Sequence, residues 1–417
     1  MERAVLVTTH LKKDKNAWDI EDSEGELIQL ALSSGGEILA NVRAQIDRIH
    51  PAYFIGSGKA EEIAGVAKDK NAEVVIFNDN LSTTQQRNLE EIIQIKTIDR
   101  TQLILDIFAR HARSTEGKFQ VELAQLEYLL PRLSGKGVML SRLGGGIGTR
   151  GPGEQKLEVD RRRIRRRITK LKEDLRRLNQ RRLILRRKRK ETDIFTVALI
   201  GYTNAGKTSL LNTLTSSDEI VRDILFSTLD SVVRHYTLPN KQKILFFDTV
   251  GFLNRLPHNL IEAFKATLEE INEADVLLHV LDIADPLAQK KKDAVYEVLN
   301  TLMVETKPVI TALNKADKVN SLELIERQKA RFENALAISA LKGNGLDELV
   351  ARIMLLANNR ISFLKIKVPQ DKLKLLYLVY KEGEVLKEEY SDQGVYIEAR
   401  VPLALKGRLE AQLGSKG

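Results

Sequence analysis

The sequence predicts an α/β protein that contains a long helical hairpin near its middle. Three observations support this fold class. Short apolar runs alternate with amphipathic segments toward both ends of the chain, a central segment follows heptad spacing, and a glycine-rich loop joins a buried strand to a helix. At about 100–200 residues per domain, the 417 residues correspond to two to four domains. We expect boundaries that give segments 1–114, 115–192, 193–359 and 360–417.

Residues 1–114 are predicted to form a small parallel α/β domain. Buried strands are expected at Ala4–Val7, Tyr53–Ile55 and Val74–Phe77, and helices at Ala60–Lys68 and Thr83–Ile93. Strands separated by helices are typical of a parallel sheet. Gly56-Ser-Gly-Lys59 resembles the end of a phosphate-binding loop, but it lacks the first glycine and a hydroxyl residue after the lysine. We therefore assign no nucleotide site here.

Residues 115–192 carry most of the basic charge. The chain has a net charge of +9, but Lys156–Lys190 contains 18 Lys/Arg and four acidic residues, a net of +14 against −5 elsewhere. Apolar residues at 4,3 spacing indicate one helix: Phe119, Leu123, Leu126, Leu130 and Leu133. A second heptad seam contains Leu157, Ile164, Ile168, Leu171, Leu175, Leu178 and Leu185, with Arg161 and Arg182 in its two other positions. Two such helices joined by one loop predict an antiparallel coiled-coil hairpin about 50 Å long.

The basic arm favours nucleic acid as a partner. A solvated coiled-coil face normally mixes both charges, whereas this one would repel itself without a polyanion. The hairpin tip, residues 142–153, holds six of the 25 glycines together with Arg142 and Arg150, so we expect it to approach RNA backbone closely. Gly146-x-Gly148-x-x-Gly151 matches a dinucleotide fingerprint, but no strand precedes it and we give it no such role.

The strongest chemical motif follows the predicted strand Phe195–Ile200. It reads G-x-x-x-x-G-K-[ST] and leads into a helix at Ser209–Leu214. Its residues are Gly201, Tyr202, Thr203, Asn204, Ala205, Gly206, Lys207 and Thr208. In this strand–loop–helix context the backbone N–H groups surround phosphates, Lys207 reaches the β and γ phosphates, and Thr208 ligates Mg²⁺.

Two further motifs, each after a predicted strand, indicate a guanine nucleotide. Strand Ile244–Phe247 leads to Asp248, Thr249, Val250 and Gly251, where Asp248 can hold Mg²⁺ and the Gly251 N–H can sense the γ-phosphate. Strand Pro308–Leu313 leads to Asn314, Lys315, Ala316 and Asp317. Asp317 can accept hydrogen bonds from two guanine N–H groups, Lys315 can lie over the base, and Ser339-Ala340 can supply a backbone donor. The sequence therefore predicts a P-loop GTPase domain that binds GTP and GDP with Mg²⁺.

The switch and the catalytic water are less well specified. Phe226, Ser227, Thr228, Leu229 and Asp230 lie between the two strands, and Thr228 is the expected switch residue that closes on Mg²⁺ in the GTP state. Thr215 and Thr237 are weaker alternatives. Many GTPases place a glutamine after the glycine of the second motif, but here Phe252 follows Gly251, so slow intrinsic hydrolysis is expected. Lys207, Thr228 and Gly251 are the candidate catalytic residues. Asn204 joins them as a candidate K⁺ ligand or loop cap, and His258 is assigned no role.

Composition excludes several classes of protein. The chain has no cysteine, which removes disulfides and thiolate metal sites, and its six histidines have no metal-ligand spacing. No apolar run reaches the ~18–20 residues of a membrane span. We expect a cytoplasmic monomer, at most peripheral at a membrane. Residues 360–417 suggest a small α/β domain with strands Ile361–Val368 and Val395–Val401 around a helix near Gln370–Glu388.

With these motifs, the chain resembles the HflX family of translation-associated GTPases over about residues 1–360. The most specific match is Arg142-Leu-Gly-Gly-Gly-Ile-Gly-Thr-Arg-Gly-Pro-Gly-Glu154, supported by segments 85–90, 97–101, 106–112 and 248–252. Where the family commonly has Gly-Glu-Thr-Gln-Leu-Glu, this chain has Gly153-Glu-Gln-Lys-Leu-Glu158. The resemblance implies binding to the large ribosomal subunit and its RNA, activation of GTP hydrolysis by the ribosome, and GTP-dependent splitting or rescue of ribosomes, notably under stress. It also implies that the tip approaches the peptidyl-transferase region.

Two other functions remain open from the sequence. One is an RNA-binding GTPase that acts as a chaperone, a helicase-like protein or a ribosome-assembly factor. The other is a membrane-surface GTPase, which is disfavoured because the heptad helix leaves no spare apolar face for a bilayer. We expect neither DNA binding nor stable membrane insertion.

Overall fold

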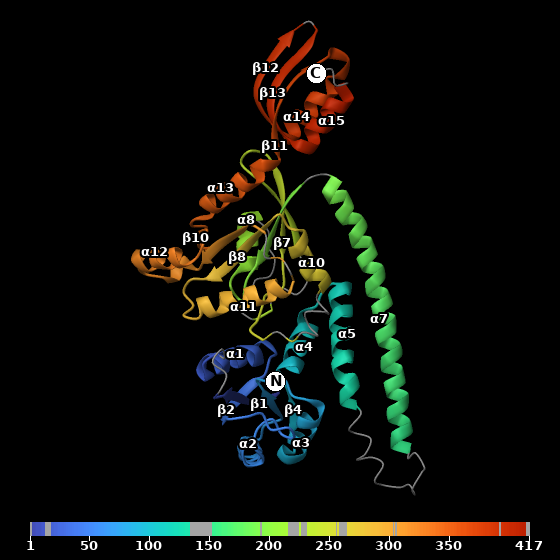
Figure 1. The fold of residues 1–417 in the computed structure, drawn as a ribbon, viewed down its shortest axis with the longest axis vertical. Helices are drawn as coiled ribbons and strands as arrows, with labels where there is room; N and C mark the ends of the chain where they lie inside the picture. Colours follow the sequence, from blue (N-terminus) through green and yellow to red (C-terminus); the bar gives the residue numbers. More distant parts are fainter. Residues whose placement is uncertain are drawn as a thin grey trace. The chain divides into compact units, whose positions relative to one another are not determined.

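The structure, a computed structural model, describes residues 2–12, 18–133, 152–191, 194–215, 225–226, 232–255, 257, 265–302, 304, 307–391 and 393–413. The chain forms two compact units. The first comprises residues 1–178, 222–230 and 255–265, and the second comprises residues 179–221, 231–254 and 266–417. Both units combine helices with β-sheets, so the predicted α/β class is confirmed (Figure 1).

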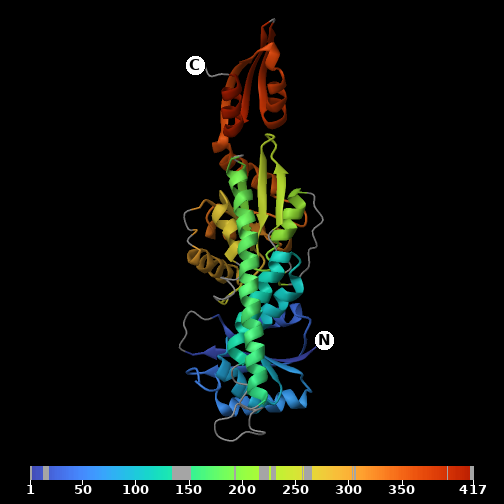
Figure 2. The same ribbon diagram turned by 90° about the vertical axis from the view of Figure 1, so that its right-hand side faces the viewer.

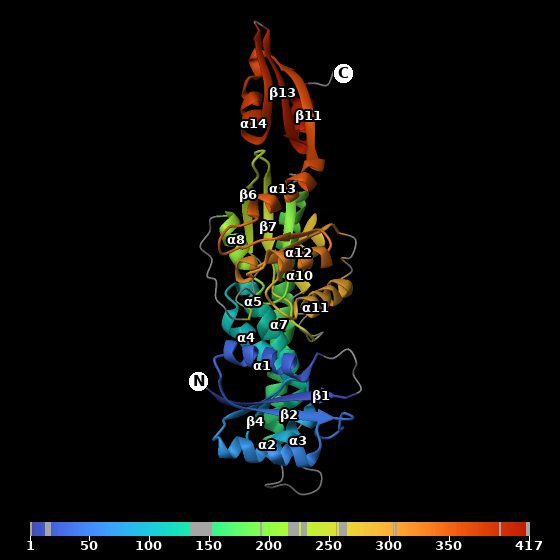
Figure 3. The same ribbon diagram turned by 90° about the vertical axis from the view of Figure 1, so that its left-hand side faces the viewer.

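The first unit is built on a four-stranded parallel sheet in the order β2-β1-β3-β4. Its elements are β1 (Arg3–Leu11), α1 (Ile20–Ser33), β2 (Glu37–Ile46), α2 (Ser57–Asp69), β3 (Val74–Phe77), α3 (Thr83–Ile93), β4 (Lys96–Ile98) and α4 (Arg100–His111). Helix α1 lies on one face of the sheet, and α2 and α3 lie on the other (Figure 3). The inner strand β3 is buried at all four positions because helices cover both of its faces.

One strand predicted for this unit is wrong. The segment Tyr53–Ile55 is not a strand, because Phe54 has a φ of 64° and forms only an isolated bridge with His50. The similarity of Gly56–Lys59 to a phosphate loop has a simple explanation, since α2 begins at Ser57. Strand β2 and helix α1 were not predicted.

The helical hairpin consists of α5 (Thr115–Arg132) and α7 (Pro152–Glu191), which run in opposite directions (Figure 1). Figure 2 shows α7 passing alongside α5. The Arg167 guanidinium donates two hydrogen bonds of 2.6 Å to the Glu122 carboxylate. Lys172 pairs with Glu127 at 2.7 Å. Leu171 in the predicted seam is fully buried. Residues 134–151, which include most of the predicted tip, lie outside the described residues.

The second unit begins with a six-stranded sheet in the order β10-β9-β8-β5-β7-β6, in which only β6 is antiparallel. Its strands are β5 (Phe195–Ile200), β6 (Val232–Thr237), β7 (Lys243–Asp248), β8 (Val276–Asp282), β9 (Val309–Asn314) and β10 (Ala335–Ala337). Its helices are α8 (Lys207–Thr215), α10 (Lys265–Glu273), α11 (Ala288–Thr301), η2 (Ala316–Lys318), α12 (Leu322–Arg331), α13 (Leu346–Ala357) and η3 (Asn358–Arg360). The carboxyl ends of β5, β7 and β9 lie at one edge of this sheet, where ligands of parallel sheets bind.

The chain ends in an antiparallel sheet of order β11-β13-β12, with α14 and α15 on one face (Figure 1). The elements are β11 (Ile361–Val368), η4 (Gln370–Lys372), α14 (Lys374–Glu382), β12 (Glu384–Ser391), β13 (Gly394–Pro402) and α15 (Leu403–Leu413). The predicted helix Gln370–Glu388 is too long. The helix ends at Glu382. A side chain at the next residue, Gly383, would lie 2.7 Å from Val401 Cγ1, and the residues that follow form an edge strand. Among all described residues, no helix is long and apolar enough to cross a membrane.

One buried polar residue in β8 makes stability depend on pH. His279 is fully buried, its ring lies edge-on to Tyr296 at 5.6 Å, and neither ring nitrogen has a hydrogen-bond partner among the described residues. Burial, with smaller contributions from Lys292 and Lys207, lowers its pKa from 6.5 to about 3. The folded protein therefore keeps His279 neutral in a pH range where the unfolded chain binds a proton.

The free energy of unfolding is expected to fall as pH drops from 6.5 towards 3, by roughly 1 kcal/mol at pH 5.5 from this residue alone. Urea denaturation at pH 7.5 and 5.5 measures the loss. His279→Leu should remove this component, because leucine binds no proton. His235→Leu, at an exposed position of β6, should retain it. Equal pH dependence in wild type and His279→Leu would contradict the assignment.

Candidate functional site

The glycine-rich loop lies between β5 and α8, as the sequence predicts. Gly201 has a φ of 152°, and a side chain there would lie 2.3 Å from the Val280 carbonyl oxygen. Gly206 has a φ of 94°, and a side chain there would lie 2.2 Å from Asn314 Nδ2. Both positions therefore require glycine. The loop leads directly into the N-terminus of α8, whose free N–H groups and dipole favour an anion.

Lys207 is the buried cation of this loop. It is 6% exposed, and its Nζ donates hydrogen bonds of 3.1 Å to the carbonyl oxygens of Gly201 and Tyr202. Burial lowers its pKa from 10.5 to about 8, although Asp248 acts in the opposite direction. An ammonium group held inside the curve of the loop is suited to phosphate oxygens, which would replace the solvation that burial removes.

Thr208 and Asp248 bring two oxygen groups together beside the lysine. The Thr208 hydroxyl donates to Asp248 Oδ2 at 2.8 Å, and Asp248 is fully buried at the end of β7. The Thr249 hydroxyl is engaged within the fold, because it donates a hydrogen bond of 2.6 Å to the Leu199 carbonyl. Hydroxyl and carboxylate oxygens are the ligand types that Mg²⁺ prefers. The donor set therefore fits a magnesium ion.

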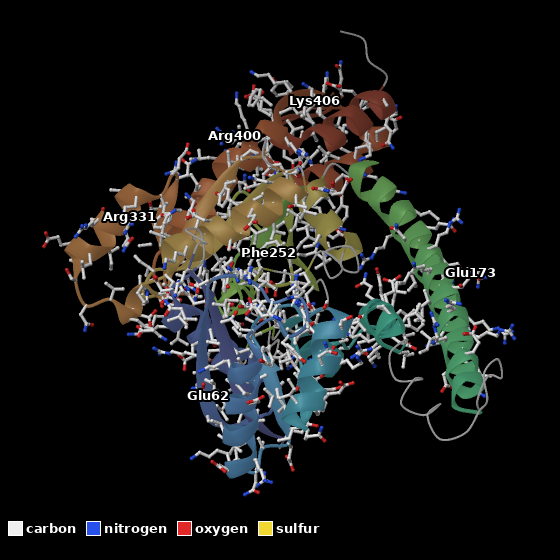
Figure 4. All side chains as sticks on the ribbon, turned by 60° about the horizontal axis from the view of Figure 1, so that its bottom comes forward. Glu62, Glu173, Phe252, Arg331, Arg400 and Lys406 are labelled. Carbon is white, nitrogen blue, oxygen red and sulfur yellow. The ribbon has the colours of Figure 1, made fainter. Side chains whose placement is uncertain are left out.

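Gly251 and Phe252 lie against the phosphate loop. A side chain at Gly251 would lie 2.8 Å from Thr203 Cγ2 and 3.2 Å from Lys207 Nζ, so its backbone is close to the lysine. Phe252 is 1% exposed and lies in the interior (Figure 4). Its N–H donates to the Gly201 carbonyl at 3.1 Å, and its carbonyl accepts from the Thr203 N–H at 2.9 Å. Phe252 thus fixes the loop, and its ring offers no group to orient water.

Asn314 joins the phosphate loop to the segments predicted to recognise the base. Its Nδ2 donates to the Ala205 carbonyl at 2.9 Å, and its Oδ1 accepts from the Ala340 N–H at 2.9 Å. Since Asn314 is only 2% exposed, both bonds are shielded from water. The side chain of this residue is therefore a connector between loops rather than a group that faces the base.

Lys315 and Asp317 are also fixed by neighbours. Lys315 has a φ of 63°, donates to the Asn204 carbonyl at 2.9 Å and pairs with Asp282 at 2.8 Å. The Ser339 hydroxyl donates to Asp317 Oδ1, and this hydrogen bond is the main cause that lowers the pKa of Asp317. Asp317 is thus held as a carboxylate, the form that accepts hydrogen bonds.

The predicted switch segment is described only in part. Phe226 belongs to the first unit, is 2% exposed and packs edge-on against Phe108 with ring centroids 4.5 Å apart. The other predicted switch residues, Ser227, Thr228, Leu229 and Asp230, lie outside the described residues, as does His258. The alternatives Thr215 and Thr237 occupy the end of α8 and the end of β6. Asn204 is exposed with a φ of 61°, and Val250 and Ala316 lie in their predicted loops.

Several contacts of the site were not predicted. Tyr202 accepts a hydrogen bond from the Asn254 N–H at its hydroxyl, at 2.7 Å, which links the phosphate loop to the segment after Gly251. Asp282 orients Lys315, although it lies 33 residues earlier in the chain. Its position at the carboxyl end of β8 is the signal that could have identified it, because that edge also carries the other site residues.

The basic helix α7 has two kinds of cation. Arg167 and Lys172 are paired with α5, as described above, whereas Arg162, Arg165 and Arg166 are exposed to solvent. Val159 and Ile184 are exposed apolar residues, at 48% and 58%. Arg162, Arg165 and Arg166 therefore form an exposed guanidinium row on α7.

Four families of known proteins match segments of this chain. Residues 196–315 match the family described as "50S ribosome-binding GTPase", and residues 323–417 match "HflX C-terminal domain". Residues 21–109 and 111–189 match the "GTP-binding GTPase N-terminal" and "GTP-binding GTPase Middle Region" families. These matches cover both units of the structure.

Named relatives match over nearly the whole chain. A "GTPase HflX" of Caldanaerobacter subterraneus subsp. tengcongensis is 44% identical over 98% of this chain and 93% of the relative. A "GTPase HflX" of Lacrimispora saccharolytica is 42% identical over 97% and 94%. A GTP-binding protein from Sulfolobus solfataricus, solved in complex with GDP, is 26% identical over 86% of this chain and 99% of its own, with a TM-score of 0.44. The chain is a GTP-hydrolysing enzyme that binds guanine nucleotide, and it belongs to the HflX family.

Proposed function

We propose that the loops at the carboxyl edge of the six-stranded sheet bind Mg²⁺ and GTP or GDP. Lys207 and the backbone of residues 201–208 bind the phosphates, and Asp317, Lys315 and the Ser339-Ala340 segment bind guanine. The observation that supports these roles is that Asn314 ties the phosphate loop to the base loops through two hydrogen bonds. Residues 248–251 form the part of the site that lies next to the γ-phosphate.

Thr208 and Asp248 would hold Mg²⁺, with Thr228 added in the GTP state. The ion would neutralise charge on the β and γ phosphate oxygens. For hydrolysis we assign Lys207 to charge stabilisation on the phosphates and the Gly251 N–H to orientation of the γ-phosphate. Because Phe252 cannot orient the attacking water, the intrinsic rate is slow. Asn204 is our candidate for a K⁺ ligand that compensates.

We further propose that the enzyme binds the large ribosomal subunit through α7 and the tip, and that its GTP-bound state splits or rescues ribosomes under stress. The exposed guanidinium row on α7 supports an RNA partner, because each phosphate contact releases counterions. The body of the chain outside Lys156–Lys190 has a net charge of −5, so a monomer in the cytoplasm would contact RNA mainly through the arm.

The test is GTP turnover with and without isolated large subunits, in K⁺ and in Na⁺ buffers, together with sedimentation in GTP and in GDP. Turnover should rise with subunits, and binding should be stronger in GTP. Equal sedimentation in both nucleotides would exclude the switching mechanism. Unwinding or annealing of naked RNA without ribosomes would favour the alternative, an RNA chaperone or assembly factor.

Substitutions on α7 can distinguish residues that contact RNA from residues that stabilise the hairpin. The triple change of Arg162, Arg165 and Arg166 to alanine should weaken large-subunit binding about 10- to 100-fold at 0.1 M salt. It should also lower the slope of log K against log salt by about two units. GTP affinity should not change. The control Arg167→Ala removes the Glu122 pair and should lower hairpin stability more than the salt slope. An unchanged slope in the triple variant would contradict the RNA contact.

A further inference from the structure

A cleft in the second unit lies between the β6–β7 turn and the C-terminal sheet. Its volume is about 600 Å³. The turn and the end of α13 form one wall, and the sheet forms the other. Its lining includes Gln242, Met354, Phe363, Glu382, Glu384 and Arg400. Phe363 and Arg400 are register partners on β11 and β13, and Glu384 on β12 is paired with Arg400, so the three come from adjacent strands.

Two carboxylates and one arginine line the cleft. Glu384 contacts Arg400 at 3.4 Å, and Glu382 contacts Arg408 at 2.9 Å. A carboxylate has about four acceptor positions, so one contact of this kind leaves capacity for further donors. The side chains of both glutamates are part-exposed, at 40% and 33%. An anionic ligand would meet one arginine and two carboxylates here, which disfavours phosphate or RNA.

Gln242 adds a buried acceptor. Its Nε2 donates to the Ala357 carbonyl at 3.3 Å, which fixes the orientation of the amide, since an oxygen at that place would face another oxygen. Gln242 is 6% exposed, and its Oε1 has no hydrogen-bond donor among the described residues. A buried polar atom without a partner is costly, and Gln242 lines the cleft, so a ligand N–H group that reached this oxygen would be favoured.

Apolar surface lies next to these acceptors. Phe363 is 46% exposed, and Met354 contributes an unbranched thioether to the opposite wall. A ligand with an alkyl stem and a cationic end satisfies both features, because the stem covers the apolar wall and the cation meets the carboxylates. We propose that this cleft binds an alkylammonium or alkylguanidinium group. The source is either an arginine side chain of a partner protein or a free polyamine.

The experiment uses the full chain with ¹³C-methyl methionine. The sequence has four methionines, and Met354, the one that the structure describes, lines the cleft, so its methyl resonance, assigned with Met354→Leu, reports occupancy. Titrations use N-acetylarginine amide, spermidine and, as an anion control, N-acetylglutamate amide at matched ionic strength. A saturable Met354 shift is expected with at least one of the cations and not with the anion.

Matched variants test the carboxylates. Glu384→Gln should weaken cation binding about fivefold. Glu389→Gln, an exposed position on the same strand that pairs with Lys387, should leave it unchanged. Tighter binding of the arginine probe points to a partner protein, and tighter binding of spermidine points to a free polyamine. The proposal is overturned if neither cation gives a saturable shift, if the anion shifts Met354 equally, or if both variants lose affinity alike. None of these outcomes depends on GTP.

Discussion

Lys207→Ala is expected to lower the affinity for GTP and for GDP by about a thousandfold. The wild-type ammonium is buried beside two carbonyl oxygens, and loss of a buried, hydrogen-bonded charge partner costs several kcal/mol. Both nucleotides should be affected because the lysine is assigned to the β phosphate as well as the γ phosphate. Equilibrium binding of fluorescent GTP and GDP analogues measures the change.

The control for this variant is Lys243→Ala, at an exposed lysine that begins β7. It removes the same charge from the same sheet and should bind nucleotide normally. Thermal unfolding without nucleotide shows whether Lys207→Ala keeps its fold. A folded Lys207→Ala protein that binds GTP as the wild type does would refute the assignment of the phosphate loop.

Asp317→Asn is expected to reduce guanine nucleotide affinity by about a thousandfold and to increase affinity for xanthine nucleotide. A site built to accept two N–H groups discriminates strongly once an acceptor is replaced, because buried polar groups are then left unpaired. The asparagine amide can instead donate to the carbonyl that xanthine has in place of the amino group. Competition between GTP and XTP for the protein gives the selectivity directly.

Ser339→Ala is a milder variant that serves as a control for the role of Asp317 in guanine recognition. It removes the hydroxyl that donates to Asp317 but keeps the carboxylate. The pKa of Asp317 should rise towards 3.8 because the hydrogen bond that lowers it is lost. At pH 7 the carboxylate stays ionised, so only a modest loss of GTP affinity and no preference for xanthine are expected. If Asp317→Asn retained full guanine selectivity, another group would have to recognise the base.

The sequence predicts several continuous apolar strands well, but the inner strand β8 was missed, whereas the edge strand β11 was predicted with its observed bounds. Strands β3, β5 and β7 are continuous apolar runs because helices or neighbouring strands cover them on all sides. The missed strands β2 and β12 are both at sheet edges, where outward positions are polar and the apolar signal is interrupted. The false strand at Tyr53–Ile55 shows the opposite error, since a short apolar run there is a buried turn.

The loops that carry the site could be located from motif order, but their internal contacts could not. Lys207, Thr208 and Asp248 converge as expected because parallel strands end at one edge. The pairing of Asp282 with Lys315 depends on which strands are neighbours, and β8 lies beside β9 only after the sheet forms. Likewise, nothing local in the sequence indicates that Phe252 closes a bridge with Tyr202.

The two hydrogen bonds of Asn314 have a consequence for the kinetics of nucleotide capture. They join three loops to one another, so these loops are held together by one side chain. Binding then requires little loss of backbone entropy, and more of the contact energy is retained as affinity. The residence time of a nucleotide would then depend on how fast the connection between the phosphate and base loops opens. We therefore expect Asn314 to influence the exchange rate of GDP for GTP, although it need not touch either nucleotide.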